Sequence, residues 1–165
     1  IDYYGGWIHY GVHLIDFFDL CFSSNIEVNS ASFAYDSKHH GDETIHIEGL
    51  LENRPIKFFG HDEEFYQISE IDMFFEKGRI LISDFGMHVD YYKKGINTEH
   101  ENVLFHEHHC SGPAMFDQMI SAYKEFSCYL DDQKSNILDS VSLKHVENVM
   151  KNLWRVKGRY EELSN

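Results

Sequence analysis

The sequence is poor in cysteine, and its cysteines are not spaced for a scaffold. Cys21, Cys110 and Cys128 are odd in number and far apart, and the chain has no C-x-x-C pair. This usage argues against a disulfide framework and favours a reducing, cytoplasmic location. A signal peptide is also missing, and no apolar run reaches the roughly 18 residues that a membrane-spanning helix needs. We therefore expect no membrane partner.

Positive charge is also scarce. The chain has 14 Lys and Arg against 28 Asp and Glu, which gives a net charge of −14 when the histidines are neutral. Such a protein repels a phosphate backbone, so nucleic acid is not an expected partner. Apolar side chains are abundant, since 42% of the 165 residues are hydrophobic and 15% are aromatic. The chain is therefore expected to fold around a core of its own.

Apolar periodicity predicts one helix, a run of strands and two closing helices. Helical spacing covers residues 7–22, and alternating β-prone segments fill the middle of the chain. Hairpin turns are expected at "ENRP", where Pro55 suits the start of a strand, and at "EKGR", where Gly78 offers a positive φ. Helical spacing returns over 114–130 and over 140–163.

The order of these elements predicts an α+β fold. Few strands are separated by helices, so we expect an open, mainly antiparallel β-sheet with helices packed on one face. No domain boundary is evident, so residues 1–165 are interpreted as a single domain. The last helix takes Ser140 as its cap, and its expected apolar face consists of Val146, Val149, Met150, Leu153 and Trp154.

One helical layer covers only one face of an open sheet. The strands are rich in large apolar side chains, so the other face would be an extensive exposed apolar surface. We therefore expect a homodimer or tetramer that pairs through this open face. The side chains that suggest it are Phe33, Tyr35, Phe58, Phe59, Met73, Phe74 and Phe75.

The stretch "GGWIHYGVHLIDFF" places His9, His13 and Asp16 on one face of the first helix, at positions i, i+4 and i+7. Three interpretations stay open. The three residues flank a core helix and bond to nearby backbone. Alternatively, two imidazoles and a carboxylate hold a metal ion. In the third interpretation, a histidine with a pKa near neutrality takes a proton from a substrate hydroxyl while a polar neighbour orients its ring.

Other candidate residues carry weaker signals. "FHEHHC" would place His106, His108 and Cys110 on one face of a strand, but no fourth zinc ligand is evident and a solvated edge strand is favoured. His39 and His40 lie in a polar loop and are expected to be simply exposed. We expect no metal on this chain. Trp7 and Tyr10 either stack on a sugar ring or pack against the sheet. For Tyr91 and Tyr92, a place on the sheet face is favoured over a sugar pocket.

The first helix resembles the segment G-G-x-x-x-D-x-G-x-H-x-x-D in the C-terminal domain of the Gfo/Idh/MocA oxidoreductases. Gly5, Gly6, Gly11, His13 and Asp16 match in place. "DETIHIEGLLENRPIKFF" is similar to the first long hairpin of that family, and "EIDMFFEKGRILI" to its next strand pair. The resemblance covers nearly the whole chain. It implies an open-sheet domain that follows a Rossmann domain, which binds NAD or NADP.

The resemblance also implies roles for single residues. His13 falls on the catalytic histidine, which acts as acid/base on a hydroxyl of a sugar, polyol or sugar nucleotide as hydride leaves for the nicotinamide. His9 stands where the family has aspartate, so it can bind a hydroxyl but supplies no fixed negative charge. Asp16 matches a second acid, for which a structural or ring-orienting role is expected. Apart from the resemblance, Tyr10 is a candidate for a substrate contact because it flanks the histidines, and Tyr66 because it lies near the second hairpin.

Two parts of such an enzyme are missing from the chain: the E-K-P motif with its lysine and the G-x-G-x-x-G phosphate loop. The start at Ile1 leads us to expect that a Rossmann domain has been excised, together with the strand before "GG". The chain alone is then not expected to be active. It would be the substrate-binding and oligomerisation domain of an NAD(P)-dependent dehydrogenase. The alternative is a non-catalytic sugar-binding or assembly module, in which His9 marks lost catalysis.

Overall fold

The computed structural model describes residues 1–22, 26–112, 124 and 143–164. The predicted first helix, series of strands and last helix are present, but a short strand precedes the first helix. In chain order the elements are β1 (Asp2–Tyr4), α1 (Trp7–Phe22), β2 (Ile26–Tyr35), β3 (Thr44–Leu51), β4 (Arg54–His61), β5 (Ser69–Phe75), β6 (Gly78–Ser83), the 3₁₀ turn η1 (Asp84–Gly86), β7 (His88–Ile96), β8 (Asn102–Ser111) and α4 (Leu143–Ser164).

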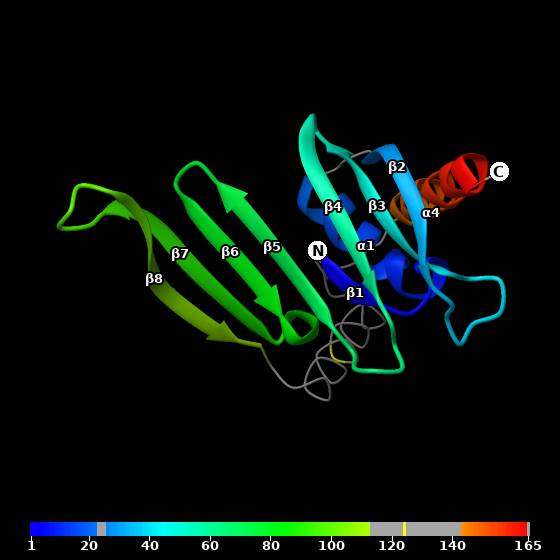
Figure 1. The fold of residues 1–165 in the computed structure, drawn as a ribbon, viewed down its shortest axis with the longest axis horizontal. Coiled ribbons are helices and arrows are strands. Elements are labelled where there is room, and N and C mark those ends of the chain that lie inside the picture. Colours follow the sequence, from blue (N-terminus) through cyan, green and yellow to red (C-terminus); the bar gives the residue numbers. More distant parts are fainter. Residues whose placement is uncertain (23–25, 113–123, 125–142, 165) are drawn as a thin grey trace.

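The described strands form one open sheet in the order β2-β3-β4-β1-β5-β6-β7-β8 (Figure 1). Their pairings are antiparallel except for that of β1 with β4, which is parallel. Both described helices lie on the same face of this sheet. The predicted α+β fold, with an open, mainly antiparallel sheet and helices on one face, is confirmed.

The short strand β1 joins the two halves of the sheet. Asp2 pairs with Phe59 of β4 on one side and with Glu70 of β5 on the other. The expectation that the strand before "GG" has been cut away is therefore wrong, because Asp2–Tyr4 form it. Tyr3 is fully buried, and its hydroxyl donates a hydrogen bond to the carbonyl oxygen of Ile45, 2.6 Å away.

The two helices pack on each other and cover the β2–β4 half of the sheet, while β5–β8 extend away from them (Figure 1). Within the described residues, no helix is long and apolar enough to cross a membrane. Phe58 is 1% exposed, so its predicted place on the open face is wrong. It points toward the helices because alternate residues of a strand face opposite sides. The largest fully buried side chains are Trp7, Tyr3, Phe58, Ile15, Ile26, Ile45, Ile47, Leu153 and Val156.

Both predicted hairpins form, but only one has the expected turn. Glu52 and Asn53 link β3 to β4 with φ values of 50° and 62°, as a tight two-residue hairpin turn requires, and Pro55 is the second residue of β4. The expectation of a positive φ at Gly78 is wrong, because this residue is the first of the extended strand β6. A Cβ at Gly78 would lie 2.2 Å from the carbonyl oxygen of Tyr92, so glycine permits the close approach of β7.

α4 buries a slightly different stripe from the predicted one. Val149 and Leu153 are buried as expected, but Trp154 is 53% exposed. The stripe continues instead through Val156 and Tyr160, three and seven residues after Leu153. The other exposed members of the predicted face are Val146 and Met150. The helix predicted over 114–130, apart from residue 124, and the cap at Ser140 lie outside the described residues.

A buried lysine explains why hydrophobic periodicity did not predict the buried stripe of α4 correctly. Lys157 is 5% exposed, and its ammonium group pairs with the carboxylate of Glu43. The same nitrogen lies 5.3 Å from the centre of the Tyr160 ring. Because the charge is paired, this helix position tolerates burial that hydrophobic periodicity alone would exclude.

An imidazole links the two helices. His145 Nε2 of α4 lies 2.6 Å from Asp16 Oδ1, and its Nδ1 lies 2.8 Å from Asp19 Oδ2, both on α1. Since carboxylates only accept, both ring nitrogens donate and the ring carries a positive charge. The hydrogen bond to Asp16 and the charge of Asp19 raise the pKa of His145 above its usual value of 6.5.

We expect the His145 ion pairs to raise the free energy of unfolding below neutral pH and to lose this contribution as pH rises. Because the folded-state pKa is raised, the contribution is complete below the unfolded-state pKa and is lost as pH passes through the folded-state pKa. Urea unfolding of the wild type and His145→Gln across this range should show a difference that shrinks as pH increases. The control His40→Gln, at an exposed loop position, should behave as wild type. A difference that does not depend on pH would contradict the assignment.

Candidate functional site

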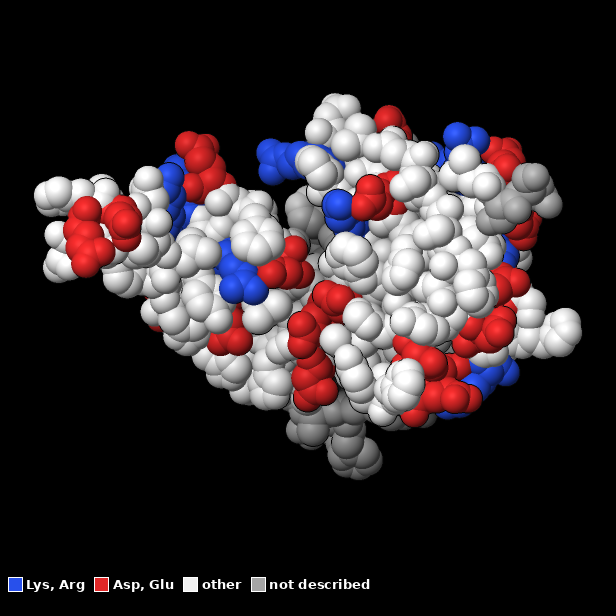
Figure 2. All heavy atoms as spheres, viewed as in Figure 1, with Lys and Arg blue, Asp and Glu red and all other residues white. Residues whose placement is uncertain are grey.

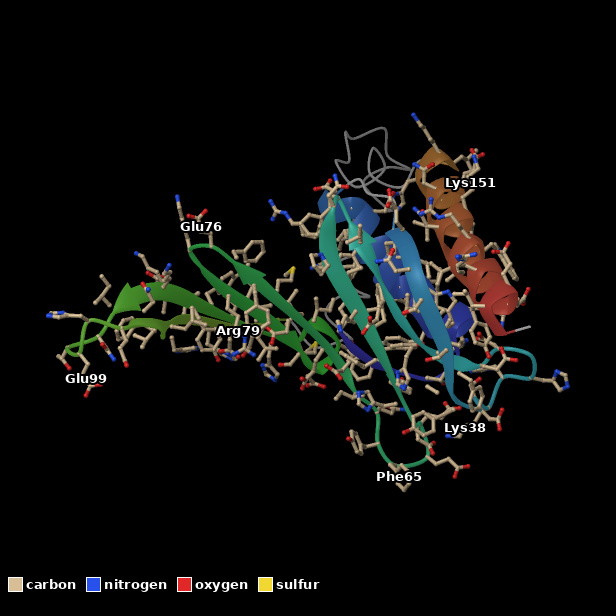
Figure 3. The ribbon with its side chains drawn as sticks, turned by 45° about the horizontal axis from the view of Figure 1, so that its top comes forward. Lys38, Phe65, Glu76, Arg79, Glu99 and Lys151 are labelled. Atoms are coloured by element: carbon tan, nitrogen blue, oxygen red, sulfur yellow. The ribbon has the colours of Figure 1, made fainter. Side chains whose placement is uncertain are left out.

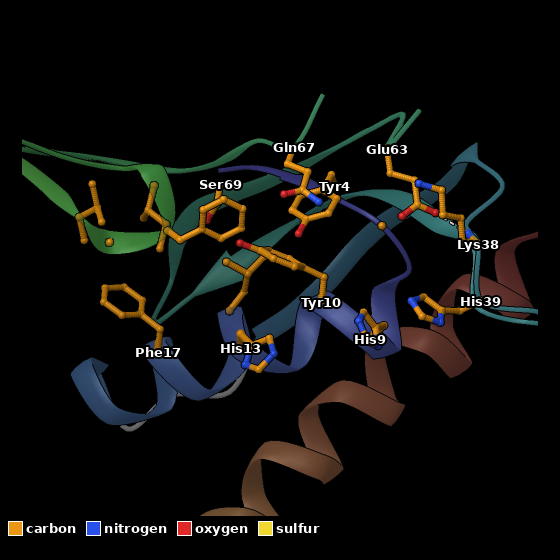
Figure 4. Close-up of a pocket in the computed structure, with 16 residues that line it drawn as sticks. Tyr4, His9, Tyr10, His13, Phe17, Lys38, His39, Glu63, Gln67 and Ser69 are labelled. Atoms are coloured by element: carbon orange, nitrogen blue, oxygen red, sulfur yellow. Dashed lines mark hydrogen bonds between the residues drawn. The ribbon is translucent and has the colours of Figure 1, made fainter. Parts of the chain in front are cut away.

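A cavity of about 690 Å³ lies beside α1, within the size range of small-molecule sites (Figure 4). Its walls come from α1, β1, the loops after β2 and β4, strands β5 and β6, and η1. The lining residues are Tyr4, Gly5, His9, Tyr10, His13, Leu14, Phe17, Lys38, His39, Glu63, Gln67, Ser69, Ile71, Ile82, Phe85 and Gly86.

α1 presents one face to this cavity and the opposite face to the core. His9, His13 and Phe17 follow one another at intervals of four residues and project from the cavity side of the helix (Figure 4). Trp7 and Ile15 are buried on the core side. The predicted spacing of His9 and His13 therefore places both imidazoles in one site, where both residues are exposed.

The start of α1 is held by a carboxylate from a distant loop. Asp42 Oδ1 accepts a hydrogen bond from the Ile8 backbone N–H at 2.7 Å, and Oδ2 accepts one from His9 N–H at 2.8 Å. These N–H groups belong to the first turn and have no partner within the helix. A negative charge here also interacts favourably with the helix dipole. Asp42 is 7% exposed, so this cap is nearly buried.

Three glycines of the "GGWIHYG" stretch make this arrangement possible. Gly5 has a φ of +75°, which turns the chain from β1 into α1. A Cβ at Gly6 would lie 2.1 Å from Asp42 Oδ2, and one at Gly11 would lie 2.6 Å from the Trp7 ring. Trp7 is fully buried, and its Nε1 donates a hydrogen bond to the Leu153 carbonyl oxygen at 3.3 Å. Trp7 therefore packs in the core and does not line a sugar pocket.

Aromatic rings form the inner wall of the cavity. The Tyr10 ring lies 5.0 Å from that of Tyr4 and 6.2 Å from that of Phe85. Burial raises the pKa of Tyr10, and a hydrogen bond with Ser69 opposes this shift. Phe85 reaches the wall from a left-handed backbone conformation, with a φ of 55°. Such a conformation is strained for a residue with a side chain, and strain of this kind clusters at functional sites.

The imidazoles occupy the open side of the cavity. The His9 ring stacks on that of His39 at 3.9 Å, so the predicted polar-loop histidine contributes to the site. The His13 ring lies 6.1 Å from that of Tyr10. No hydrogen bond or ion pair joins the His13 ring to another of the described residues. Its ring nitrogens therefore remain available to a ligand.

Two other predicted site residues lie elsewhere. Asp16 does not line the cavity and binds His145, which gives it a structural role between the helices. The metal site predicted as one alternative from His9, His13 and Asp16 is therefore not assembled. Among the described residues, no group of three or more His, Cys, Asp or Glu side chains is arranged to hold a metal ion. Tyr66 is 61% exposed in the loop between β4 and β5, outside the lining, and its substrate role stays a prediction.

The histidines of "FHEHHC" do not share one face in the expected way. The pairing of β8 with β7 shifts between Tyr91 and Tyr92, so Tyr91 opposes His108 and Tyr92 opposes His106. This β-bulge turns His106 away from His108, whose ring stacks on Tyr91. The two tyrosines lie on opposite faces of the sheet, outside the cavity. The expected alignment of His106 with His108 is therefore wrong.

Sequence reasoning missed the residues that the loops contribute. Lys38 and Glu63 meet across the mouth of the cavity, where the Lys38 backbone N–H donates to the Glu63 carboxylate (Figure 4). Gln67 lines the same region, and Phe85 reaches it from η1. These residues come from three separate connections, so no local spacing in the sequence relates them to His13.

Two solved structures share this fold. An NAD-binding protein from Listeria innocua matches with a TM-score of 0.57 and 17% identity, over 99% of this chain and 51% of that chain. A super-repressor mutant of Gal80p from Saccharomyces cerevisiae matches with a TM-score of 0.57 and 13% identity, over 99% of this chain and 54% of that chain. The chain thus spans about half the length of each, and at these identities the likeness is one of fold. No protein-family model and no curated protein matches it.

Removing the Asp42 carboxylate should destabilise the fold and displace the site. Loss of a helix cap with two charge-assisted hydrogen bonds costs about 2 kcal/mol, so Asp42→Ala should lower the free energy of unfolding by roughly that amount. Urea denaturation measures this change. Asp36→Ala, at an exposed position of the same loop, is the matched control and should be neutral. Equal stability of the two variants would show that the cap does not hold α1.

Proposed function

We propose that this chain is the substrate-facing domain of an NAD(P)-dependent oxidoreductase acting on a sugar, polyol or sugar nucleotide, with His13 as the proton-transfer residue. The observation that carries this proposal is the His13 imidazole on the wall of a cavity of about 690 Å³, where no other described residue forms a hydrogen bond or ion pair with it. The fold likeness to an NAD-binding protein about twice as long supports the same class of function.

His13 would move the proton of the reacting hydroxyl. A neutral imidazole accepts this proton as the alcohol becomes a carbonyl, and the imidazolium returns it in the reverse direction. Histidine is the side chain that most often takes up and returns a proton in this way.

The neighbours of His13 would hold the carbohydrate. His9 binds a hydroxyl through a ring nitrogen and is itself positioned by stacking on His39. Tyr10 offers an aromatic face, which suits the apolar face of a sugar ring, and a hydroxyl group that engages Ser69. Tyr66 would reach the substrate from the exposed loop at the rim.

The cofactor would be held mainly by a second domain. The cavity has an apolar side, against which the nicotinamide ring would pack. This side is formed by Leu14, Phe17, Ile71, Ile82 and Phe85. The chain has no G-x-G-x-x-G loop for the pyrophosphate. Bound NAD(P) supplies the hydride acceptor, and this chain supplies the wall that places the hydroxyl.

A non-catalytic sugar-binding or assembly module is the second candidate. His9 stands where the resembling oxidoreductases have aspartate, so the site lacks that fixed negative charge. One of the two structural neighbours is a mutant of Gal80p described as a super-repressor, a description that names no enzymatic reaction. A full-length protein that binds a sugar nucleotide but does not reduce NAD(P) would favour this candidate.

His13→Asn in the full-length protein should lower kcat by about 10²–10⁴-fold, because acid/base catalysis typically contributes that much. Binding of NAD(P) should not change, since His13 is assigned to the proton of the substrate. Steady-state kinetics and cofactor titration measure the two quantities. His40→Asn, on an exposed loop outside the cavity lining, should have the wild-type kcat. Unchanged turnover in His13→Asn would remove the assigned role.

We also propose that the β2–β5 part of the open face of the sheet forms a homodimer, which leaves the same face of β7 and β8 exposed. Figure 2 views the face opposite the helices, where uncharged atoms cover a broad area over β2–β4. Phe59 and Phe74 are 43% and 71% exposed there. Arg79 lies between Phe74 and Tyr92, 5.3 Å from the centre of each ring. Met73 and Phe75, by strand alternation, belong to the opposite face.

Phe74→Glu should shift the full-length protein from dimer toward monomer, because a charge would be desolvated in the paired face. Analytical ultracentrifugation over a range of concentrations measures the dissociation constant. Phe65→Glu is the matched control, since Phe65 is 79% exposed at a loop tip away from the strands (Figure 3). A wild type that is monomeric at every concentration would contradict the proposal.

A further inference from the structure

A series of hydrogen-bonded side chains lies on the last two strands, at the end of the sheet away from the helices (Figure 1). Asp90 of β7 and His109 of β8 are cross-strand neighbours, and Asp90 Oδ1 lies 2.8 Å from His109 Nδ1. The other ring nitrogen, His109 Nε2, lies 3.0 Å from the hydroxyl oxygen of Ser111. A carboxylate, an imidazole and a hydroxyl are thus linked in that order.

The carboxylate decides which groups in the series donate. An ionised Asp90 can only accept, so the proton of the neutral His109 ring lies on Nδ1 and Nε2 keeps a lone pair. The Ser111 hydroxyl therefore donates to Nε2. His106 Nε2 lies 2.9 Å from the same Asp90 oxygen. The hydrogen bonds from His106 and His109 lower the pKa of Asp90, which keeps it ionised.

The strand geometry brings these groups to one face. His109 and Ser111 are two residues apart on β8, so both point to the side of the sheet that Asp90 occupies. The β-bulge of this hairpin adds His106 to the same side. The cavity lies on the other face, because Ile82, which lines it, pairs with Val89, the residue before Asp90.

We propose that Ser111, His109 and Asp90 form a nucleophilic relay that takes acyl groups from small activated esters and passes them to water. A hydroxyl beside a base, with the base oriented by a carboxylate, is the arrangement that activates serine for acyl transfer. This activity is separate from the proposed function and uses none of the cavity residues.

The reaction needs only the ester and water. The Ser111 oxygen forms a bond to the carbonyl carbon, and its proton passes to His109 Nε2. The bond from that carbon to the leaving oxygen then breaks, and the leaving oxygen takes the proton from Nε2. Water attacks the acyl group in the same way, which releases a carboxylic acid and restores the hydroxyl.

His88 supplies a donor beside the reacting oxygen. Its Nδ1 lies 3.4 Å from the Ser111 oxygen, and its ring stacks on that of His109 at 5.4 Å. The Ser111 hydroxyl already donates its proton to His109. In the contact with His88, the Nδ1–H group is therefore the donor and the Ser111 oxygen the acceptor. Once the Ser111 oxygen has bonded to the ester carbon, the carbonyl oxygen would lie within a few Å of this donor, which could then bind it.

The relay is open to solvent, and this limits its substrates. The side chain of His109 is 43% exposed and that of Asp90 is 22% exposed. An open site offers little shape selection and does not exclude water, so we expect slow turnover of small esters with good leaving groups.

A fluorophosphonate probe tests the relay in the full-length protein, because an activated serine oxygen bonds to its phosphorus as fluoride leaves. Peptide mass spectrometry should find the label on Ser111, and Ser111→Ala should remove it. His109→Gln should slow labelling at least about tenfold, since a general base contributes about 10²–10⁴-fold. Ser32→Ala, at another exposed strand serine, should label at the wild-type rate.

Hydrolysis of p-nitrophenyl acetate provides the second measurement. Asp90→Asn should slow the part of this hydrolysis that depends on Ser111, because an amide donor facing Nδ1 favours the tautomer with its proton on Nε2. Circular dichroism shows whether each variant keeps the fold. Histidines elsewhere also cleave this ester, and Ser111→Ala retains that background. The proposal is overturned if Ser111 carries no label, or if His109→Gln labels as fast as the wild type.

Discussion

The contact between Asp42 and the first turn of α1 determines where the candidate site can form. Asp42 lies in the loop between β2 and β3, and its carboxylate binds the backbone N–H groups of Ile8 and His9. This contact ties the helix to the covered half of the sheet and sets the rotation of its first turn. Gly6 is part of the same constraint, since any side chain there would overlap the carboxylate. The motif "GG" is thus explained by the backbone turn at Gly5 and by packing at Gly6, whatever chemistry follows.

One half of the sheet, β2–β4, is covered by helices and forms the core, whereas β5–β8 have no covering helix among the described residues. β2–β4 bury their apolar side chains beneath α1 and α4, where Trp7, Phe58 and Leu153 share one core. β1 extends the hydrogen bonding across the centre, so β5–β8 are held in register without a covering helix among the described residues. The cavity lies at this boundary, where α1 and its imidazoles meet the first strand of the uncovered half. Such boundaries are common places for ligand sites because rigid elements meet there without filling the space.

The features that depend on local periodicity and turn residues could be predicted from the sequence. The spacing of His9 and His13 on a helix, the hairpin turn at Glu52 and Asn53, and the antiparallel sheet all follow from local patterns. Contacts between distant segments could not be predicted in this way. Asp42 caps a helix more than thirty residues earlier, and Glu63 reaches the cavity from another loop. The bulge in β8 places His106 and His108 on opposite faces of the sheet. One extra residue between the paired positions shifts the two-residue alternation of the strand.

The central claim is that the capped helix presents His13 to a reacting hydroxyl, with a hydride acceptor supplied from outside this chain. The most direct test is a crystal structure of the full-length protein with NAD(P) and its substrate bound. The account predicts that the reacting oxygen lies about 2.6–3.2 Å from a ring nitrogen of His13, within the cavity beside α1. A substrate oxygen held by other groups, with the His13 ring turned toward solvent, would contradict it.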